Sequence, residues 1–122
     1  MRAAVIFMNG FEEVEGLTVV DMLRRLSITC DIVGKTSEVT GAHNITVKSD
    51  RLLEEIKSEE YDAVILPGGL PGATNLRDDE KVMTVLKEMN TEGKIVAAIC
   101  AAPIALERAG VIEGKEFTAY PG

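Results

Sequence analysis

Few of the residue types that mark specialised protein classes occur in this chain. Its 122 residues include two cysteines, one histidine and no tryptophan. Cys30 and Cys100 lie too far apart for the short spacings of a zinc site or for a disulfide framework. We therefore expect both thiols to be reduced, and we expect neither a resident metal nor another cofactor.

Basic residues and long apolar runs are also scarce. The formal net charge is −7, which argues against nucleic acid, because phosphate binding needs a basic face. No apolar stretch reaches the roughly 18 residues of a membrane span, and the N-terminus lacks the basic-then-apolar layout of a signal peptide. We expect a single cytoplasmic domain over residues 1–122 that binds neither membrane nor nucleic acid.

What the chain does contain is an alternation of short apolar runs and helical periodicities. Turn residues at 41–44 predict a hairpin across 39–47. The run at 95–99 has the pattern of a strand buried on both faces. Alternating strands and helices indicate an α/β fold with a mainly parallel sheet. The predicted strands are 3–7, 28–33, 63–66, 95–99 and a last one near 117–119; the predicted helices are 12–26, 50–57, 79–90 and 102–109.

The predicted helices each have one apolar face, which we expect to point inward. Acidic residues start the first helix, and Arg24 and Arg25 end it, as the helix dipole favours. The inward side chains are expected to be Val14, Leu17, Val20 and Leu23 in the first helix, Leu52, Leu53 and Ile56 in the second, and Val82, Val85, Leu86 and Met89 in the third.

Ligands of open parallel sheets bind beyond the carboxyl ends of the strands, so the loops that follow strands carry the functional information. Three such loops stand out. They are Asn9–Glu15 with its acidic cluster, Pro67–Gly72 with its glycines, and the turn at Cys100. The sequence therefore predicts a site at one edge of the sheet.

Cys100 lies where the strand 95–99 turns into the helix 102–109. A helix N-terminus favours a thiolate over a thiol, and a thiolate is the reactive nucleophile. Alanines around Cys100 leave room for a tight corner, although the Gly-x-Ser-x-Gly signature of a nucleophile elbow is absent. We interpret Cys100 as a nucleophile; the alternative is a buried structural cysteine.

The glycine turn and the acidic cluster each have more than one interpretation. Gly68 and Gly69 permit positive φ and can aim N–H groups into a cleft, as an oxyanion site requires. A phosphate cradle lacks its lysine, and a plain turn is the other alternative. Glu15, one helical turn from Glu12, is a solvated cap residue or a carboxylic acid that hydrogen-bonds the thiolate and shuttles protons.

Three segments together resemble the ThiJ/PfpI superfamily, in the branch of the parkinsonism-associated deglycase (DJ-one) and its bacterial and archaeal relatives. They are Gly10–Glu15 (GFEEVE), Leu66–Leu76 (LPGGLPGATNL) and Ala97–Pro103 (AAICAAP). The resemblance implies a flavodoxin-like three-layer sandwich, similar to class I glutamine amidotransferases, and a homodimer. It also implies that Cys100 is the reactive cysteine, Glu15 its carboxylic acid partner, and Gly69 and Ala101 the oxyanion donors.

Two departures from the family pattern affect these expectations. Tyr120 stands where many members carry a histidine, and a tyrosine cannot act as a base near neutral pH. Gly68 and Tyr120 are expected beside the substrate. The chain stops at Gly122, whereas family members continue, so we expect either a fragment or a second polypeptide that completes the fold.

The resemblance implies cofactor-independent chemistry on small reactive aldehydes, of the glyoxalase or deglycase kind, with Cys100 as the nucleophile and Glu15 as the acid and base. The alternative is a redox sensor or chaperone that works by oxidation of Cys100. A cysteine peptidase or amidase is disfavoured, because Ala101 rather than histidine follows the nucleophile. We expect His43 to be an exposed turn residue and Cys30 a packed strand residue.

Overall fold

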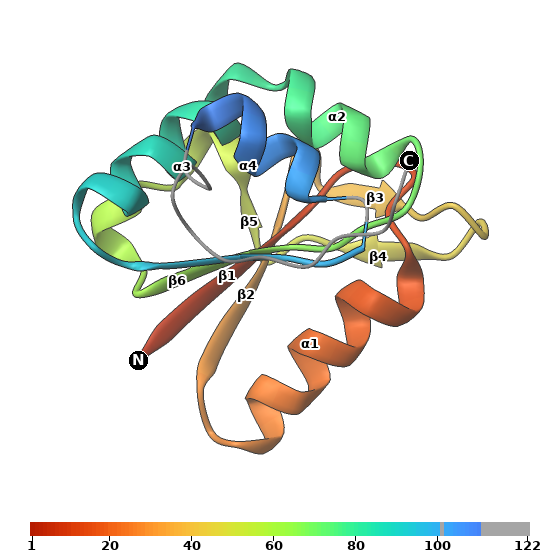
Figure 1. The fold of residues 1–122 in the computed structure, drawn as a ribbon. Helices are drawn as coiled ribbons and strands as arrows, with labels where there is room; N and C mark the ends of the chain where they lie inside the picture. The colour runs from red at the N-terminus through yellow and green to blue at the C-terminus, as the bar shows by residue number, and fades with distance from the viewer. Residues whose placement is uncertain (101, 111–122) are drawn as a thin grey trace.

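The computed structural model describes residues 1–100 and 102–110, and its elements alternate along the chain as expected (Figure 1). The strands are β1 (Arg2–Phe7), β2 (Thr29–Gly34), β3 (Glu38–Thr40), β4 (Thr46–Lys48), β5 (Arg51–Leu52), β6 (Ala63–Leu66) and β7 (Ile95–Ala98). The helices are α1 (Glu13–Arg25), α2 (Gly72–Asp78), α3 (Glu80–Thr91) and α4 (Pro103–Ala109), with 3-10 turns η1 (Leu53–Glu55) and η2 (Ser58–Glu60).

The main sheet has the strand order β5-β2-β1-β6-β7, and all of its pairings are parallel. β1 lies at the centre, where Ala3 is in register with Cys30 on one side and Ala63 on the other. The chain therefore runs outward from β1 first to one edge and then to the other. This parallel order with helices on both faces is a flavodoxin-like α/β fold, as the sequence predicted.

The two faces of the sheet carry separate cores. Figure 1 shows α1 on one face and α2, α3 and α4 on the other. β1 alternates between them: Ile6 packs toward α2–α4, whereas Val5 and Phe7 pack toward α1. On the α1 face, the rings of Phe7 and Phe11 meet edge to face with centroids 4.6 Å apart.

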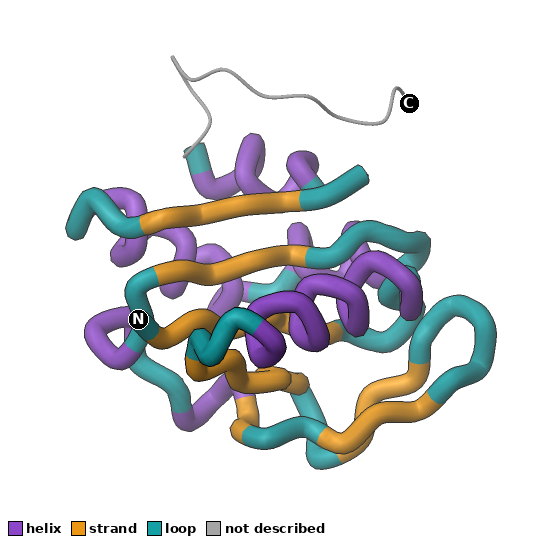
Figure 2. Tube along the Cα trace, turned by 90° about the horizontal axis from the view of Figure 1, so that it is seen from below, coloured by secondary structure: helices purple, strands orange, loops and turns teal. Residues whose placement is uncertain are grey.

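The hairpin predicted across 39–47 is confirmed as the antiparallel pair β3–β4. Figure 2 shows it beyond the main sheet, on the side where the parallel strands end. Backbone hydrogen bonds tie it to the loop after β1, from Gly10 N to Thr40 O (2.8 Å) and from Ala42 N to Phe11 O (2.8 Å). The hairpin tip therefore lies beside the start of α1.

The prediction of a helix at 50–57 is wrong. Residues 51–52 instead form β5 and extend the sheet beside β2, and only a single 3-10 turn follows. The cause is Asp50, which pairs with Ile32 twice: its N–H donates to Ile32 O, and its carboxylate accepts from Ile32 N. These bonds draw the chain along the open edge of β2, while Leu53 and Ile56 still point inward as expected.

Three further expectations need correction. β7 is not buried on both faces: it is the edge strand of the described sheet, and Ile95 is 54% exposed. Val14 lies on the outer side of α1, 71% exposed, because the helix turns Gly16 and Val20 to the core instead. The short helix α2 is not predicted from the sequence, because it begins at Gly72, a residue type that disfavours helices. The strand expected near 117–119 lies outside the described residues.

The other predicted helices are confirmed. α3 begins after Asp79, whose carboxylate accepts from Val82 N at 3.0 Å, and its inward side chains are the predicted ones. α4 has Pro103 at its first position and ends at Gly110, whose φ is 74°. Within residues 1–100 and 102–110, no helix combines the length and apolar character that crossing a bilayer requires.

Candidate functional site

The loops after β1, β6 and β7 meet at the carboxyl edge of the sheet, as the parallel topology predicts. Glu12 N donates to Gly68 O at 2.9 Å, which joins the first loop to the second. Ile99 N donates to Leu66 O at 3.0 Å, which extends the pairing of β6 with β7 as far as the third loop. The acidic cluster, the glycine turn and the cysteine are thereby held on one edge.

Cys100 occupies a strained turn between β7 and α4. Its φ is 56°, a left-handed conformation that costs a non-glycine residue of order 1–3 kcal/mol. Ala102 N donates to Ile99 O at 3.0 Å and closes the turn. The cysteine is half-buried. The strand, corner and helix expected around this residue are confirmed, and such strain is characteristic of functional turns.

Gly68 lies between Glu15 and Cys100, the two residues that are predicted to act together. A Cβ placed on Gly68 would stand 2.5 Å from Glu15 Oε1 and 2.8 Å from Cys100 Cβ. These two atoms are therefore no more than about 5.3 Å apart, the sum of the two distances. Glu15 Oε1 also accepts a hydrogen bond from Gly68 N at 2.9 Å. The structure thus brings Glu15 and Cys100 together across a backbone that has no side chain.

The two glycines of the turn differ in what their N–H groups do. The Gly68 N–H is occupied by Glu15. Gly69 has a φ of +95°, as a glycine permits, and its N–H donates to no described residue. Gly69 is therefore the glycine of the turn that can offer a donor to a ligand. Ala101 and Tyr120, the other residues expected near the substrate, lie outside the described residues.

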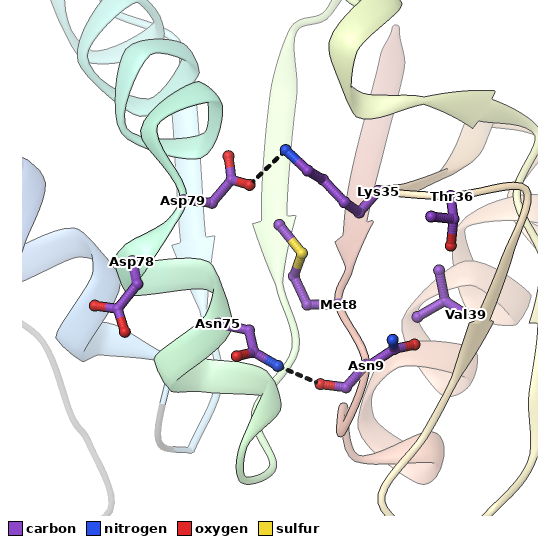
Figure 3. A pocket seen from close by; sticks show the side chains of 8 residues that line it. All are labelled: Met8, Asn9, Lys35, Thr36, Val39, Asn75, Asp78 and Asp79. Carbon is purple, nitrogen blue, oxygen red and sulfur yellow. Dashed lines mark hydrogen bonds and ion pairs between the residues drawn. The ribbon is translucent and has the colours of Figure 1, made fainter.

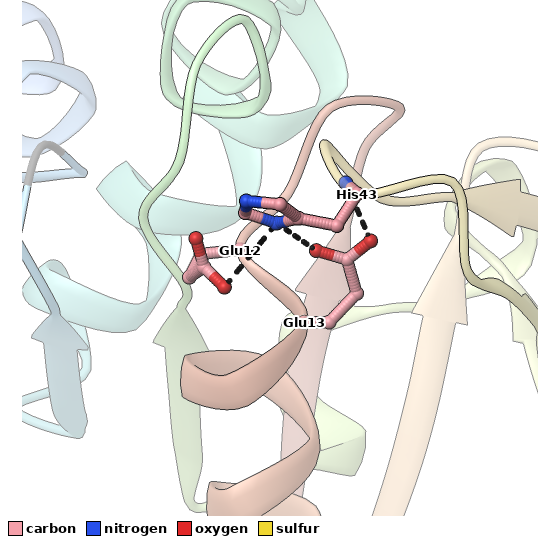
Figure 4. A group of neighbouring side chains, drawn as sticks. All are labelled: Glu12, Glu13 and His43. Carbon is pink, nitrogen blue, oxygen red and sulfur yellow. Dashed lines mark hydrogen bonds and ion pairs between the residues drawn. The ribbon is translucent and has the colours of Figure 1, made fainter.

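A second cluster at this edge was missed by sequence reasoning. Figure 4 shows Glu13 against His43, at the tip of the hairpin. Glu13 Oε1 lies 2.9 Å from His43 Nδ1, while Oε2 accepts from His43 N at 2.7 Å and from Ile45 N at 3.2 Å. Gly41 leaves the space that the Glu13 carboxylate fills. His43 is exposed in a turn, as predicted, but its partner lies 30 positions away and no local pattern signals it.

These contacts shift the pKa values of both Glu13 and His43. Burial alone would raise the pKa of Glu13, but hydrogen bonds from the His43 ring and from backbone N–H groups outweigh it and lower this pKa to about 2. The hydrogen bond to Glu13, together with the charges of Glu12 and Glu13, raises the pKa of His43. The contact therefore favours the charged form of each group, and it fastens the hairpin to α1.

A cavity of about 300 Å³ opens farther along the same edge, near the ends of β1 and β2 (Figure 3). Lys35 stands at its rim, 2.6 Å from Glu54 and 2.9 Å from Asp79, and these carboxylates raise the pKa of Lys35. The cavity is not lined by Cys100 or Glu15. Its lining residues are Met8, Asn9, Lys35, Thr36, Val39, Asn75, Asp78 and Asp79.

Cys30 differs from Cys100 as the sequence suggested. It is 4% exposed within β2, and burial raises the pKa of its thiol. A buried thiol with a raised pKa is a poor nucleophile. Of the two cysteines, only Cys100 combines partial exposure with a position at the loop edge.

A flavodoxin-like sheet with a cysteine on a strained strand-to-helix turn defines the class of this protein, and the comparisons with known proteins define its family. The family described as DJ-1/PfpI matches residues 1–122. The chain is 36% identical over 121 residues to protein dj-1beta of Drosophila melanogaster (98% of this chain, 65% of that protein). It is 37% identical over 123 residues to a deglycase of Pyrococcus abyssi (100% and 74%). The chain belongs to the DJ-1/PfpI family.

Solved structures agree with this assignment. The structure described as oxidized DJ-1 of Toxoplasma gondii superposes on this chain with a TM-score of 0.94 at 33% sequence identity. The superposition covers 98% of this chain and 67% of the Toxoplasma chain. The chain spans about two thirds of the length of these animal and protozoan relatives.

The first prediction concerns Gly68. A Gly68→Ala substitution places a methyl group 2.5 Å from Glu15 Oε1 and 2.8 Å from Cys100 Cβ, closer than nonbonded atoms can approach, so Glu15 and Cys100 are forced apart. We expect the reaction of Cys100 with iodoacetamide at pH 7 to slow about tenfold, because the thiolate loses its neighbouring acid. Mass spectrometry of the Cys100 peptide over time measures this rate.

The matched control is Gly93→Ala. Gly93 also has a positive φ, but a Cβ there meets nothing within 4 Å. This variant carries only the cost of backbone strain and should keep the original reaction rate. Equal rates in the Gly68→Ala and unsubstituted proteins would contradict the close approach of Glu15 and Cys100.

The second prediction concerns the pH dependence of stability. Glu13 has a folded-state pKa of about 2, below its ordinary value of 4.5, so its contribution is complete above pH 4.5 and is lost as the pH falls toward 2. His43 has a raised pKa, so its contribution is complete below its ordinary value of 6.5 and is lost as the pH rises through the raised value.

Urea unfolding of the unsubstituted and Glu13→Gln proteins from pH 2 to 9 tests this dependence. The substituted protein should unfold at lower urea throughout. The gap between the two midpoints should be widest between pH 4.5 and 6.5 and should narrow toward pH 2. A gap that stays constant across the whole range would show that the charge of Glu13 does not contribute.

Proposed function

We propose that this chain carries the site of a cofactor-independent enzyme that converts small 2-oxoaldehydes into 2-hydroxy acids through a covalent bond to Cys100. The observation that carries the proposal is the position of Gly68 between Glu15 and Cys100. The closeness of these two residues supports roles for Glu15 as acid and base and for Cys100 as nucleophile. The relative from Pyrococcus abyssi is named a deglycase, which supports an enzymatic function in this chain.

The reaction would begin with the addition of the Cys100 thiolate to the aldehyde carbon of a substrate such as methylglyoxal. The aldehyde oxygen becomes an alkoxide, which the N–H groups of Gly69 and Ala101 would stabilise as an oxyanion site. Gly69 suits this role because its N–H donates to no described residue.

Glu15 would first give its proton to the alkoxide. Its carboxylate would then take the proton from the former aldehyde carbon and return it to the carbon of the neighbouring carbonyl group, while the hydroxyl proton passes to the oxygen of that group. The aldehyde carbon is oxidised to the thioester level while the ketone is reduced to a hydroxyl, so no external oxidant or cofactor takes part. Water hydrolyses the thioester, which releases the 2-hydroxy acid and restores the thiol. Oε1 of Glu15 is held by the Gly68 N–H at 2.9 Å, which fixes the carboxyl group for this transfer.

A second function uses the same residues. The relative from Toxoplasma gondii is described as oxidized, and a half-buried thiol at a loop edge is accessible to peroxide. Oxidation of Cys100 to a sulfinic acid would place two acceptor oxygens near Glu15. Such a site would report peroxide rather than turn over aldehydes.

The third prediction tests both functions. We expect the protein to form lactate from methylglyoxal without glutathione, and we expect Cys100→Ser to abolish this activity. Glu15→Gln keeps an oxygen for the Gly68 N–H but cannot shuttle protons, so turnover should fall about 10²- to 10⁴-fold. Cys30→Ala should remain active, because Cys30 is buried in β2.

Full lactate formation by Cys100→Ser would overturn the enzymatic proposal. If the unsubstituted protein forms no lactate, and mild peroxide adds two oxygen atoms to Cys100 alone, the enzymatic proposal is wrong and the sensor function is supported.

We also propose that the protein acts as a homodimer through the outer face of α1. Val14, Met22 and Leu26 are 71%, 49% and 66% exposed, and their spacings of eight and four residues follow one inclined row along α1 to its C-cap, with Thr18 between the first two. An exposed apolar stripe of this kind marks a contact surface. A second copy of the chain is the occupant, because the stripe can pair with itself around a twofold axis.

The fourth prediction follows from this stripe. The double variant Val14→Glu and Met22→Glu should sediment as a monomer in analytical ultracentrifugation, whereas the unsubstituted protein should sediment as a dimer. Lys87→Glu, on the exposed side of α3, also adds negative charge and should leave the dimer intact. A dimer that survives the double substitution would place the interface elsewhere.

A further inference from the structure

Glu12, Glu13 and His43 form a group with the composition and spacing of a metal site. Each offers one ligand atom, and the three atoms lie within 4.8 Å of one another. His43 Nδ1 is 2.9 Å from Glu13 Oε1 and 3.7 Å from Glu12 Oε1. A tetrahedral zinc ion with bonds of ~2.0–2.2 Å separates its ligands by roughly 3.3 Å, and the distances of His43 Nδ1 from the two carboxylates, 2.9 and 3.7 Å, lie on either side of this value.

We propose that Glu12, Glu13 and His43 bind one divalent transition-metal ion, for which Zn²⁺ is the best match. An imidazole nitrogen with two carboxylates selects zinc and its neighbours over Mg²⁺ and Ca²⁺, which prefer oxygen ligands alone. No sequence motif indicates this site, because two ligands come from the start of α1 and the third from the hairpin tip (Figure 4).

The Glu13 carboxylate is already positioned as a ligand. Its side chain is only 5% exposed. Oε2 is held by the N–H groups of His43 and Ile45, which leaves Oε1 directed at the imidazole ring. Backbone donors to the second oxygen of a carboxylate ligand orient it and raise metal affinity.

The other two ligands can adjust to an ion. Among the described residues, the Glu12 carboxylate accepts one hydrogen bond, a long one of 3.4 Å from Val14 N, and otherwise lies 3.7 Å from His43 Nδ1, so it can turn toward the site at little cost. His43 is 66% exposed, which leaves room for a water molecule as the fourth ligand. The positive end of the α1 dipole opposes a cation, but the two full negative charges outweigh its partial charge.

Binding would exchange one set of bonds for another. The metal ion takes the lone pair of His43 Nδ1, the proton on that nitrogen passes to solvent, and the hydrogen bond between His43 and Glu13 becomes two metal–ligand bonds. The ion would fasten the hairpin tip to the helix whose first turn also carries Glu15. The aldehyde reaction proposed above does not require this ion.

His43 is the single histidine of the chain, so its ring protons give an unambiguous NMR signal. The fifth prediction uses the full chain with Cys100→Ser, which removes the accessible thiol as a competing ligand. We expect added Zn²⁺ to shift the His43 ring signals to a saturating end point at one ion per chain, and we expect Mg²⁺ to leave them unchanged. Calorimetry measures the affinity.

Single substitutions test whether zinc binds at these three residues or elsewhere on the protein. His43→Gln should weaken zinc binding at least about tenfold and Glu12→Gln should also weaken it, whereas Glu55→Gln, on an exposed turn far along the chain, should not. Circular dichroism checks that each variant is folded. If the His43 signals do not respond to Zn²⁺, or if His43→Gln binds zinc as tightly as its parent, the proposal is overturned. Zinc binding only in the protein that retains Cys100 would also overturn it.

Discussion

The arrangement of the candidate site depends on backbone atoms lying where side chains would otherwise stand. Gly10 packs against Pro71, Gly68 against Glu15 and Cys100, and Gly69 against the backbone of Glu12. Each of these contacts leaves no room for a Cβ. The three loops therefore approach closely because these positions have no side chains, and the geometry of the candidate site follows from that approach rather than from attraction between Glu15 and Cys100.

The start of α1 is held at two places, and this is what fixes the carboxyl groups. Glu12 N bonds to the glycine turn through Gly68 O, and the Glu13 carboxylate bonds to the hairpin tip. Glu15 is one turn farther along the same helix, so its direction is set by both attachments. The hairpin, which contributes nothing to the main sheet, thus has a clear structural role in the site.

Much of this arrangement could be predicted from sequence because it is recorded in local patterns. The apolar run at 63–66 and the Pro103 and Gly110 punctuation predicted β6 and α4 correctly. Parallel topology then placed the loops of Glu15, Gly68 and Cys100 on one edge without any knowledge of distances.

The errors arose where a long-range contact overrode a local preference. Residues 50–57 have helical spacing, but the open edge of β2 and the paired hydrogen bonds of Asp50 hold them as β5 and a short turn. The pairing of Glu13 with His43 has the same character: it joins two segments 30 residues apart. Neither contact has a periodicity, so neither could be predicted from a window of sequence.

The strain at Cys100 has to be balanced by packing, and α4 supplies it. Ala102 and Ala105 are fully buried against the α2–α4 core, which holds the residues that follow the strained turn. α4 in turn packs on α2, and α2 begins directly after the glycine turn. Any movement of α4 would therefore shift Cys100 and the Gly69 N–H together. The contact between α4 and α2 therefore links the turn of Cys100 to the loop of Gly69.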